Sequence, residues 1–528
     1  MRNRTRLFAG AISLLLFTAA CGELDDKKNS DGADSEGIES AIPLADDYDA
    51  EGHLDWAWSN PVTHWDPVKS VTGGDLYWYN PVFDRLLRME PDGTIVPMLA
   101  ETWEPSADGK SLTMTLQEGL TFSDGTPFNA EAVKFNLDRA AGQGSTIAGE
   151  VEQISSVEVI DAATVKINVD NALGALITSL AVRPGIMISP TAAQAGTTAD
   201  HPVGVGPYIV TESIPGDQVS YEKSPNYWDA DAQNTATMTF YAMSDDQTRL
   251  NALESGQVDG AYLSPNQADS AQGADLNVIS APTSTFVYFM LNEAVEPYDD
   301  PKVRQAVNMA IDREGIAEGL YEGFCTPEIQ PWPSTSFAYD EEIGDGSEIW
   351  PHDPEAAKKL MEEAGVTEPV EMTAVTTNIT QYQQLAEVLQ QNFKEIGINM
   401  TIKPGPSAEG VQLYAVDKSA HGNINPYTGI PDPHGPIVRY LIPGALYNPG
   451  EQTPQEMLDK AYEAATPIDP AERAPLYAEF MEMWVEDPPH MMPICFVHSA
   501  SALSDQVSGV AISSSAGPDM RYAAIAKE

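Results

Sequence analysis

The sequence has few basic residues and few cysteines for its length. Lysine and arginine together number 28 among 528 residues, against 79 aspartates and glutamates, which gives a formal net charge of -51. A field of that sign repels the phosphates of nucleic acids and anionic lipid head groups, so we expect neither as a partner. The three cysteines, Cys21, Cys325 and Cys495, lie too far apart for a zinc motif or a CxxC redox pair.

Long apolar runs and catalytic motifs are also missing. After residue 20, no stretch approaches the roughly 18 consecutive apolar residues of a membrane-spanning helix. The histidines include no HExxH motif, and Gly204 and Gly206 are followed by Ile209 where a dinucleotide-binding fingerprint has its third glycine. We therefore predict a protein that is not an enzyme, with no catalytic residues, no metal and no cofactor.

The first 40 residues are typical of an exported and lipid-anchored protein. Three arginines precede an apolar run from Leu7 to Ala20, which is too short for a hydrocarbon core of about 30 Å. Ala19 and Ala20 directly before Cys21 resemble a bacterial lipobox, in which the cysteine carries the lipid. We predict a signal peptide over residues 1–20 and a flexible tether over residues 21–40, rich in Asp, Glu, Ser and Gly.

This N-terminus predicts an extracytoplasmic protein held at the bacterial cell membrane, at the cell surface or in the periplasm. The alternative is an ordinary secretory signal with a chance cysteine. Outside the cytoplasm, Cys325 and Cys495 could form a disulfide. Two buried free thiols are the other possibility, because sequence alone does not place the two Cα atoms within bonding range.

The length predicts about three domains, and the local patterns predict a mixed α/β fold. Alternation at Leu112, Met114 and Leu116 predicts a half-buried strand, and Asn129 is a candidate cap for a helix that ends at Arg139. Further helices are predicted to begin at the four pairs Asp300-Pro301, Asp353-Pro354, Thr453-Pro454 and Asp469-Pro470, and one more over residues 381–396. Strands are predicted over residues 286–291 and 398–402.

Several stretches resemble the extracellular solute-binding proteins of family 5, the peptide, nickel and oligosaccharide receptors of ABC importers. The longest is Leu-Ala-Glu-Thr-Trp-Glu-Pro-Ser-Ala-Asp-Gly-Lys at residues 99–110. The others follow in the family's order at residues 122–128, 136–139, 202–208, 224–228, 252–260, 303–313 and 469–473.

The resemblance implies a two-lobed α/β clamshell of three domains, of the periplasmic-binding-protein type (class II, cluster C). Domain I would combine residues 41–90, 200–285 and 495–528, domain II would be 91–199, and domain III would be 286–494. Hinge strands would lie near residues 286–292 and 492–497. The implied partners are a small-molecule or peptide ligand and the permease subunits of an ABC importer, with the protein acting as a monomer.

The resemblance also suggests where a ligand would bind. Peptide-binding members carry an aspartate for the peptide α-amino group a few residues before an Asp-Pro step. Here the step is Asp432-Pro433 and Gly429 stands at the anchor position, so Asp432 or another carboxylate would have to substitute. The candidate ligand-binding residues, each of which could instead be a packing residue, are Trp65, Tyr77, Tyr79, Met290, Trp332, Asn423, Asn425, Tyr427, Asp432 and His434.

We therefore expect a substrate-binding lipoprotein that captures an oligopeptide or similar polar solute between two lobes and delivers it to the permease. One alternative is a receptor for an oligosaccharide or a nickel chelate, the latter resting on His421 and His434. A less favoured alternative is a surface hydrolase that acts on the same kinds of compound.

Overall fold

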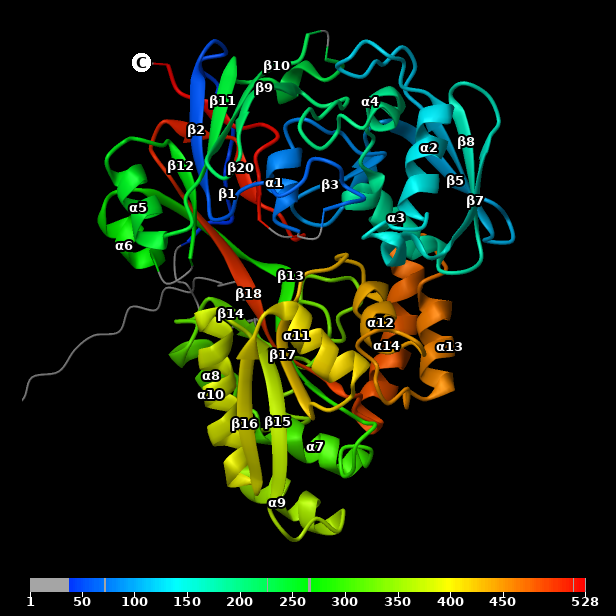
Figure 1. The fold of residues 1–528 in the computed structure, drawn as a ribbon, viewed down its shortest axis with the longest axis vertical. Coiled ribbons are helices and arrows are strands. Elements are labelled where there is room, and N and C mark those ends of the chain that lie inside the picture. Colours follow the sequence, from blue (N-terminus) through cyan, green and yellow to red (C-terminus); the bar gives the residue numbers. More distant parts are fainter. Residues whose placement is uncertain (1–37, 71–72, 226, 265–266, 516, 528) are drawn as a thin grey trace, which may run out of the picture. The chain divides into compact units, whose positions relative to one another are not determined.

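Two long antiparallel strands run through the centre of the protein. In the computed structural model, which describes residues 38–70, 73–225, 227–264, 267–515 and 517–527, β13 (Asn277–Leu291) pairs with β18 (Met491–Leu503) over nearly its whole length. Asn277 lies opposite Leu503 at one end and Met290 lies opposite Met491 at the other. Figure 1 shows both strands passing from the upper group of elements to the lower one.

These strands belong to an 11-stranded sheet with the order β16-β15-β17-β13-β18-β12-β2-β11-β10-β9, in which β14 (Cys325–Pro327) adds to β18. The other members are β2 (His53–Trp58), β9 (Tyr208–Ile214), β10 (Gln218–Lys223), β11 (Thr237–Ala242), β12 (Gly260–Leu263), β15 (Val370–Thr377), β16 (Ile398–Gly405) and β17 (Gly422–Tyr427). The predicted strands are present, but β13 begins nine residues before Phe286, because Ser, Thr and Pro at residues 280–285 give that half of the strand no apolar run.

A separate four-stranded sheet has the order β5-β6-β8-β7. Its strands are β5 (Ala100–Pro105), β6 (Ser111–Leu116), β7 (Ile154–Val159) and β8 (Thr164–Val169). The apolar face of this sheet shares one core with α2 (Ala130–Ala140) and α3 (Leu173–Ala181). The predicted cap of α2 is confirmed, since the Asn129 side chain accepts a hydrogen bond from the Ala132 N–H at 3.1 Å.

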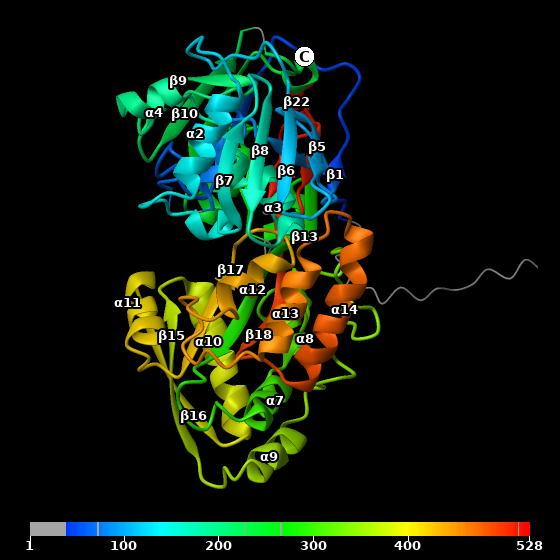
Figure 2. The same cartoon turned by 90° about the vertical axis from the view of Figure 1, so that its right-hand side faces the viewer.

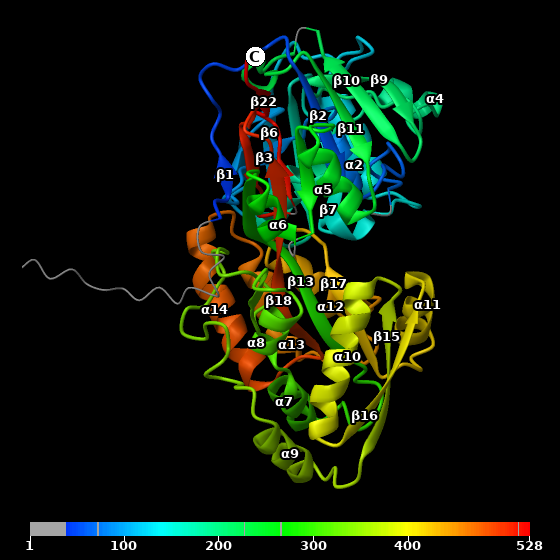
Figure 3. The same cartoon turned by 90° about the vertical axis from the view of Figure 1, so that its left-hand side faces the viewer.

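The main helices of the second half are α7 (Pro301–Ala310), α8 (Arg313–Gly319), α9 (Pro354–Glu363), α10 (Thr380–Glu395), α12 (His434–Tyr440), α13 (Gln455–Ala464) and α14 (Pro470–Glu486). Helices α7, α9, α13 and α14 begin at the four predicted pairs, and α10 lies within one residue of its predicted range, whereas α8 and α12 were not predicted. Asp300, Asp353 and Asp469 each cap a helix with the side chain, whereas α13 begins after Pro454 without a side-chain cap. Helices α13 and α14 lie side by side (Figure 2), and α10 packs along β15 and β16 (Figure 3).

The remaining elements are short. They are β1 (Ala41–Ile42), β3 (Leu87–Met89), β4 (Ile95–Pro97), β19 (Val507–Ser508), β20 (Val510–Ile512), β21 (Pro518–Asp519), β22 (Ala524–Ile525), α1 (Asp75–Tyr79), α4 (Pro190–Ala195), α5 (Asp246–Glu254), α6 (Ala268–Gly273) and α11 (Ser407–Val411). None of the helices in the described part of the chain combines the length and the apolar character that crossing a membrane requires.

The predictions for the signal peptide, for Cys21 and for most of the tether fall on residues 1–37, outside the described residues. Glu39, at the predicted end of the tether, forms a β-bridge with Ile279 of β13. The folded body therefore begins no later than this bridge.

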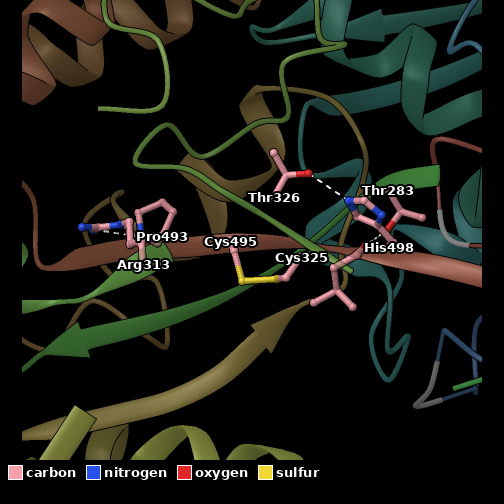
Figure 4. The surroundings of a disulfide bond; sticks show 8 residues. Thr283, Arg313, Cys325, Thr326, Pro493, Cys495 and His498 are labelled. Atoms are coloured by element: carbon pink, nitrogen blue, oxygen red, sulfur yellow. Dashed lines mark hydrogen bonds between the residues drawn. A yellow bond between two sulfur atoms is a disulfide. The ribbon is translucent and has the colours of Figure 1, made fainter. Parts of the chain in front are cut away.

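A disulfide joins Cys325 in β14 to Cys495 in β18 (Figure 4). Both cysteines are buried in the largest apolar cluster, whose members all lie between Phe286 and Phe496. Nearby, Thr326 Oγ1 and His498 Nε2 are hydrogen-bonded at 2.9 Å, and Arg313 donates to the Pro493 carbonyl. Of the two possibilities that the sequence left open, the structure has the bonded pair.

Removing this disulfide is expected to destabilise the protein. The double substitution Cys325→Ser with Cys495→Ser frees the unfolded chain from a closed loop of 170 residues, so the free energy of unfolding should fall by about 2–4 kcal/mol in a urea titration. The denatured wild-type protein, alkylated without reductant, should show no label on either cysteine in its peptide masses. Labelling of both would contradict the disulfide.

Candidate functional site

A cavity of about 570 Å³ lies among segments that are far apart in the sequence. One wall comes from α1 and the residues around it, β3, residues 181–183, Ser513, Ser515 and residues 517–521. Another part of the lining comes from the loop of residues 428–431 and from Arg439 in α12. The volume is in the range of roughly 300–1,000 Å³ that is typical of sites for small solutes.

Arginine is strongly concentrated in this cavity. The whole sequence has 13 arginines, and five of them line the cavity: Arg85, Arg88, Arg183, Arg439 and Arg521. Among the described residues, no lysine lines it, and the lining carboxylates are Glu150 and Asp519. Glu90, Asp84 and Asp229 lie behind the lining and also contact these arginines, so five arginines and five carboxylates make the group formally neutral in a chain of net charge -51.

Arg88 and Arg521 are held by carboxylates. Arg88 donates to Asp519 at 2.8 Å and to Glu90 at 2.8 Å. Arg521 donates to Asp84 at 3.1 Å and to Asp229 at 2.7 Å. These pairs fix both guanidinium groups and neutralise most of their charge, so they form the frame of the site.

The other three arginines differ in how far their charge is compensated. Arg183 forms an ion pair with Glu150. Arg85 and Arg439 form no ion pair with any carboxylate in the described part of the chain. Arg85 donates from Nη2 to the Asn80 side-chain oxygen, and burial lowers its pKa to about 10, which leaves it charged at neutral pH. Arg439 is exposed and lies over the ring of Tyr447, 5.5 Å from its centroid.

Two aromatic side chains complete the lining on the side of β2 and α1. Trp58, the last residue of β2, stacks on Tyr77 of α1 with the ring centroids 4.5 Å apart and the planes 7° from parallel. The indole Nε1 of Trp58 is buried and has no hydrogen-bond acceptor. An aromatic surface of this kind contributes apolar contact to a ligand.

Most of the aromatic residues predicted to bind a ligand lie in the core instead. Tyr77 lines the cavity. Trp65 and Tyr79 are buried with their ring centroids 5.9 Å apart. Met290 is fully buried in the largest apolar cluster, and Trp332 packs in the same cluster against Tyr477 at 5.3 Å. These four side chains are packing residues and do not line the cavity.

The predicted residues of β17 lie beside the cavity loop. Asn425 donates to the side-chain oxygen of Asn423, and neither residue lines the cavity. Tyr427 is buried and stacks on Phe286 with centroids 5.1 Å apart, and its hydroxyl donates to the Ile430 carbonyl at 2.8 Å. This hydrogen bond holds the loop of residues 428–431, which does line the cavity.

The position expected to carry a peptide anchor is confined by the same tyrosine. Gly429 lines the cavity, but a Cβ atom there would lie 2.4 Å from both Cζ and the hydroxyl oxygen of Tyr427. Such distances are far below van der Waals contact. An aspartate at this position would require the Tyr427 ring to move, and with it the hydrogen bond to Ile430.

Asp432 does not replace the missing anchor. Its carboxylate accepts from Arg473 at 2.7 and 2.9 Å, from Thr178 Oγ1 at 2.9 Å and from the His434 N–H at 2.9 Å. Burial alone would raise the pKa of Asp432, but Arg473 and these donors hold it below its ordinary value. Asp432 is 3% exposed and does not line the main cavity, so its acceptors are already occupied.

The histidines do not make a metal site. His434 is buried beside a separate cavity of about 20 Å³, and burial lowers its pKa to about 4, so it is neutral at pH 7. His421 Nδ1 accepts from the Thr373 N–H at 2.9 Å. In the described residues, no group of three or more His, Cys, Asp or Glu side chains is placed to hold a metal ion.

Sequence reasoning missed the arginines. Each of them occurs in a chain that is rich in carboxylates, so an ion pair is the default expectation for any one of them. The one available signal was the scarcity of arginine, because five of only 13 arginines in the sequence line this cavity.

A profile of the bacterial extracellular solute-binding proteins, family 5, matches residues 94–443, about two thirds of the chain. The chain belongs to this family. Its members are extracytoplasmic solute-binding proteins. The glutathione-binding protein GsiB of Salmonella typhi is 29% identical over 448 residues, which cover 81% of this chain and 85% of that protein.

Solved structures show the same fold. The dipeptide-binding protein from Pseudoalteromonas sp. SM9913 in complex with Met-Leu matches with a TM-score of 0.75 and 24% identity, over 90% of this chain and 100% of that one. NikA from Brucella suis in complex with Fe(III)-EDTA matches with a TM-score of 0.77 and 23% identity, over 90% and 100% of the two chains. The expected family and the two-lobed α/β fold are thereby confirmed, and the relatives are binding proteins.

The buried group around Asp432 gives a test of this part of the structure. Asp432→Asn leaves Arg473, whose side chain is 3% exposed, without its counter-ion, so the free energy of unfolding should fall by about 3–5 kcal/mol in a urea titration. Thr178→Val removes a single hydrogen bond to the carboxylate and keeps the ion pair, so its effect should be smaller, about 1.5–3 kcal/mol. Equal effects of the two variants would contradict the central role of the Asp432–Arg473 pair.

Proposed function

We propose that the protein is the extracytoplasmic substrate-binding component of an ABC importer. It captures an oligopeptide or similar polar solute in the 570 Å³ cavity and delivers it to permease subunits in the membrane, acting as a monomer. The observation that carries this proposal is the cavity itself, which in a family 5 chain is lined jointly by residues 428–431 and by segments from the N-terminal half. A ligand that contacts the loop of residues 428–431 and the N-terminal segments at the same time stabilises the closed arrangement, in which these two sides of the cavity lie close together.

Contacts beside the cavity support this coupling. Gly174 N donates to the Thr466 carbonyl at 3.1 Å, and Ala175 N donates to the Ala465 carbonyl at 3.2 Å, so α3 is bound directly to the chain that follows α13. A Cβ at Gly174 would lie 1.9 Å from the Pro467 carbonyl oxygen, so this approach requires glycine. These bonds hold α3 against the end of α13 in the arrangement that the structure has.

The three-domain division predicted from the family resemblance also remains our proposal. Three apolar clusters support it: one lies between Phe286 and Phe496, a second between Leu86 and Val205, and a third combines N-terminal aromatic residues with the last strands. Each cluster has its own sheet or part of a sheet, as independent domains require.

Ligand binding is testable by a thermal-shift screen. The purified protein should melt several degrees higher with at least one short peptide or similar polar solute, because a ligand at 100 times its Kd stabilises by about 2.7 kcal/mol. Oligosaccharides and the nickel–histidine chelate serve as the comparison classes. Flat melting curves for all three classes would contradict the proposal, and release of products from the bound compound over hours, followed by mass spectrometry, would favour a hydrolase instead.

We further propose that Cys21 carries a lipid that anchors the mature protein to the membrane. The support is the sequence around it, in which Ala19 and Ala20 follow a short apolar run. Cells grown with an alkyne fatty acid should label the wild-type protein, while Cys21→Ser should lose the label and leave the membrane fraction. Ser30→Ala, in the predicted tether, is the matched control and should keep both properties; an unlabelled wild-type protein would indicate an ordinary secretory signal.

A further inference from the structure

Resting on the proposed function, we infer that the ligand is a small anion with at least two carboxylate groups, which bind the unpaired guanidinium groups of Arg85 and Arg439. The inference names the class of solute that the cavity selects. It excludes cationic peptides and free divalent metal ions as the preferred ligand.

The first support is the local balance of charge. The five lining arginines and the five carboxylates that contact three of them are formally neutral together, although the chain carries -51 overall. A charge that is removed from bulk water is stable only with a counter-charge or with hydrogen bonds. An acidic protein that gathers five of its 13 arginines around one cavity provides for a negative ligand there.

The second support is the state of the two arginines. Arg88, Arg183 and Arg521 have carboxylate partners within the protein, whereas Arg85 and Arg439 have none among the described residues. They belong to different parts of the wall, since Arg85 precedes β3 and Arg439 is in α12. A planar guanidinium matches a carboxylate with two parallel hydrogen bonds, so two separate arginines fit a ligand with two carboxylates.

The third support is the kind of hydrogen-bonding capacity that the cavity leaves unused. In the described part of the chain, two buried side-chain atoms of lining residues lack a partner: Arg85 Nε and Trp58 Nε1. Both are donors, and neither can accept a hydrogen bond. Both atoms are covered by neighbouring protein atoms, so a ligand reaches them only after a side chain shifts; the unused capacity of this wall is for donation only, which a carboxylate matches.

The fourth support is the lack of a free carboxylate for a cation. Glu150 is paired with Arg183, and Asp519 with Arg88. Gly429 has no room for an aspartate, and Asp432 is occupied by Arg473. A ligand's ammonium group therefore finds no unpaired counter-ion among the described lining residues, so its positive charge adds little to binding.

Isothermal titration with matched probes tests the inference on the mature protein in detergent. Glu-Glu and Gln-Gln have nearly the same shape and differ in the two side-chain charges, Lys-Lys reverses them, and citrate carries carboxylates without a peptide bond. We expect Glu-Glu or citrate to bind at least tenfold more tightly than Gln-Gln, and Lys-Lys to show no binding. Tighter binding of Glu-Glu would indicate an acidic peptide as the ligand class, and tighter binding of citrate would indicate a simple organic acid.

Variants localise the effect. Arg439→Gln, at an exposed residue, should weaken binding of the preferred anion by about 30-fold or more and leave the melting temperature nearly unchanged. Arg85→Gln should do the same, with its melting temperature measured alongside. Lys358→Gln removes the same charge from the exposed face of α9, away from the cavity lining, and should change the affinity less than twofold.

The outcomes separate this inference from the proposed function. Gln-Gln binding as tightly as both anions, or an affinity unaffected by both arginine variants, would overturn the anionic class while a receptor for neutral solutes stands. The anionic class would also be overturned, and the receptor function retained, if Glu-Glu and citrate fail to bind while the thermal-shift screen finds a neutral or cationic ligand. Failure of every compound in both experiments would overturn the inference and the proposed function together.

Discussion

The pairing of β13 with β18 is the constraint on which the rest of the structure depends. Both strands contribute to the upper and the lower parts of the 11-stranded sheet, and the register shifts between Pro282 and Phe286, where the ladder passes from one part to the other. The disulfide to β14 and the bonds around His498 attach further chain to β18 beside this point. Thr285, in the same stretch of β13, lines the cavity, so the backbone that joins the two parts also borders the site.

The cavity combines fixed charges with free ones. Asp84, fully buried, accepts from Tyr227 and Trp228 as well as from Arg521, so that arginine is positioned before any ligand arrives. Prior positioning of this kind lowers the entropy that the protein side chain loses when a ligand binds. Arg85 and Arg439 lack such carboxylates, and they are the groups whose charge a ligand can compensate. The arginines with carboxylate partners shape the cavity, and the two without such partners are the ones proposed to contact the solute directly.

Much of the fold could be predicted from the sequence because its signals are local. Asp300, Asp353 and Asp469 each cap the helix that the following proline begins, since a short side-chain acceptor and a proline satisfy the same helix terminus. The family resemblance predicted the two-lobed arrangement from motifs of a few residues each. The start of β13 was missed, because the small polar residues at 280–285 give no apolar run or alternation, although this half of the strand pairs with β18.

The site was harder to predict, because lining a cavity is a property of the tertiary structure. Aromatic residues are common in ligand-binding sites, which made Trp65, Tyr79 and Trp332 candidates. In the structure their rings pack against other aromatic rings in the core. Asp432 was a candidate anchor on the strength of its position in a motif, but a distant residue, Arg473, occupies it. Whether Arg85 is paired depends likewise on side chains that the sequence does not bring near it. The local sequence shows which side chains are charged. Whether a charged side chain has a counter-ion depends on the tertiary structure.

The close fit of Tyr427 against Gly429 has a consequence for how the binding preference of such a protein can change over evolutionary time. A single substitution at residue 429 that introduces a carboxylate meets the tyrosine ring at 2.4 Å, so it damages the loop before it creates a new contact. A smaller residue at position 427 alone leaves a hole beside Phe286 and releases the Ile430 carbonyl. The two positions are therefore coupled, and a mutational path toward recognition of a ligand ammonium group at this loop passes through an intermediate that is less stable than either end.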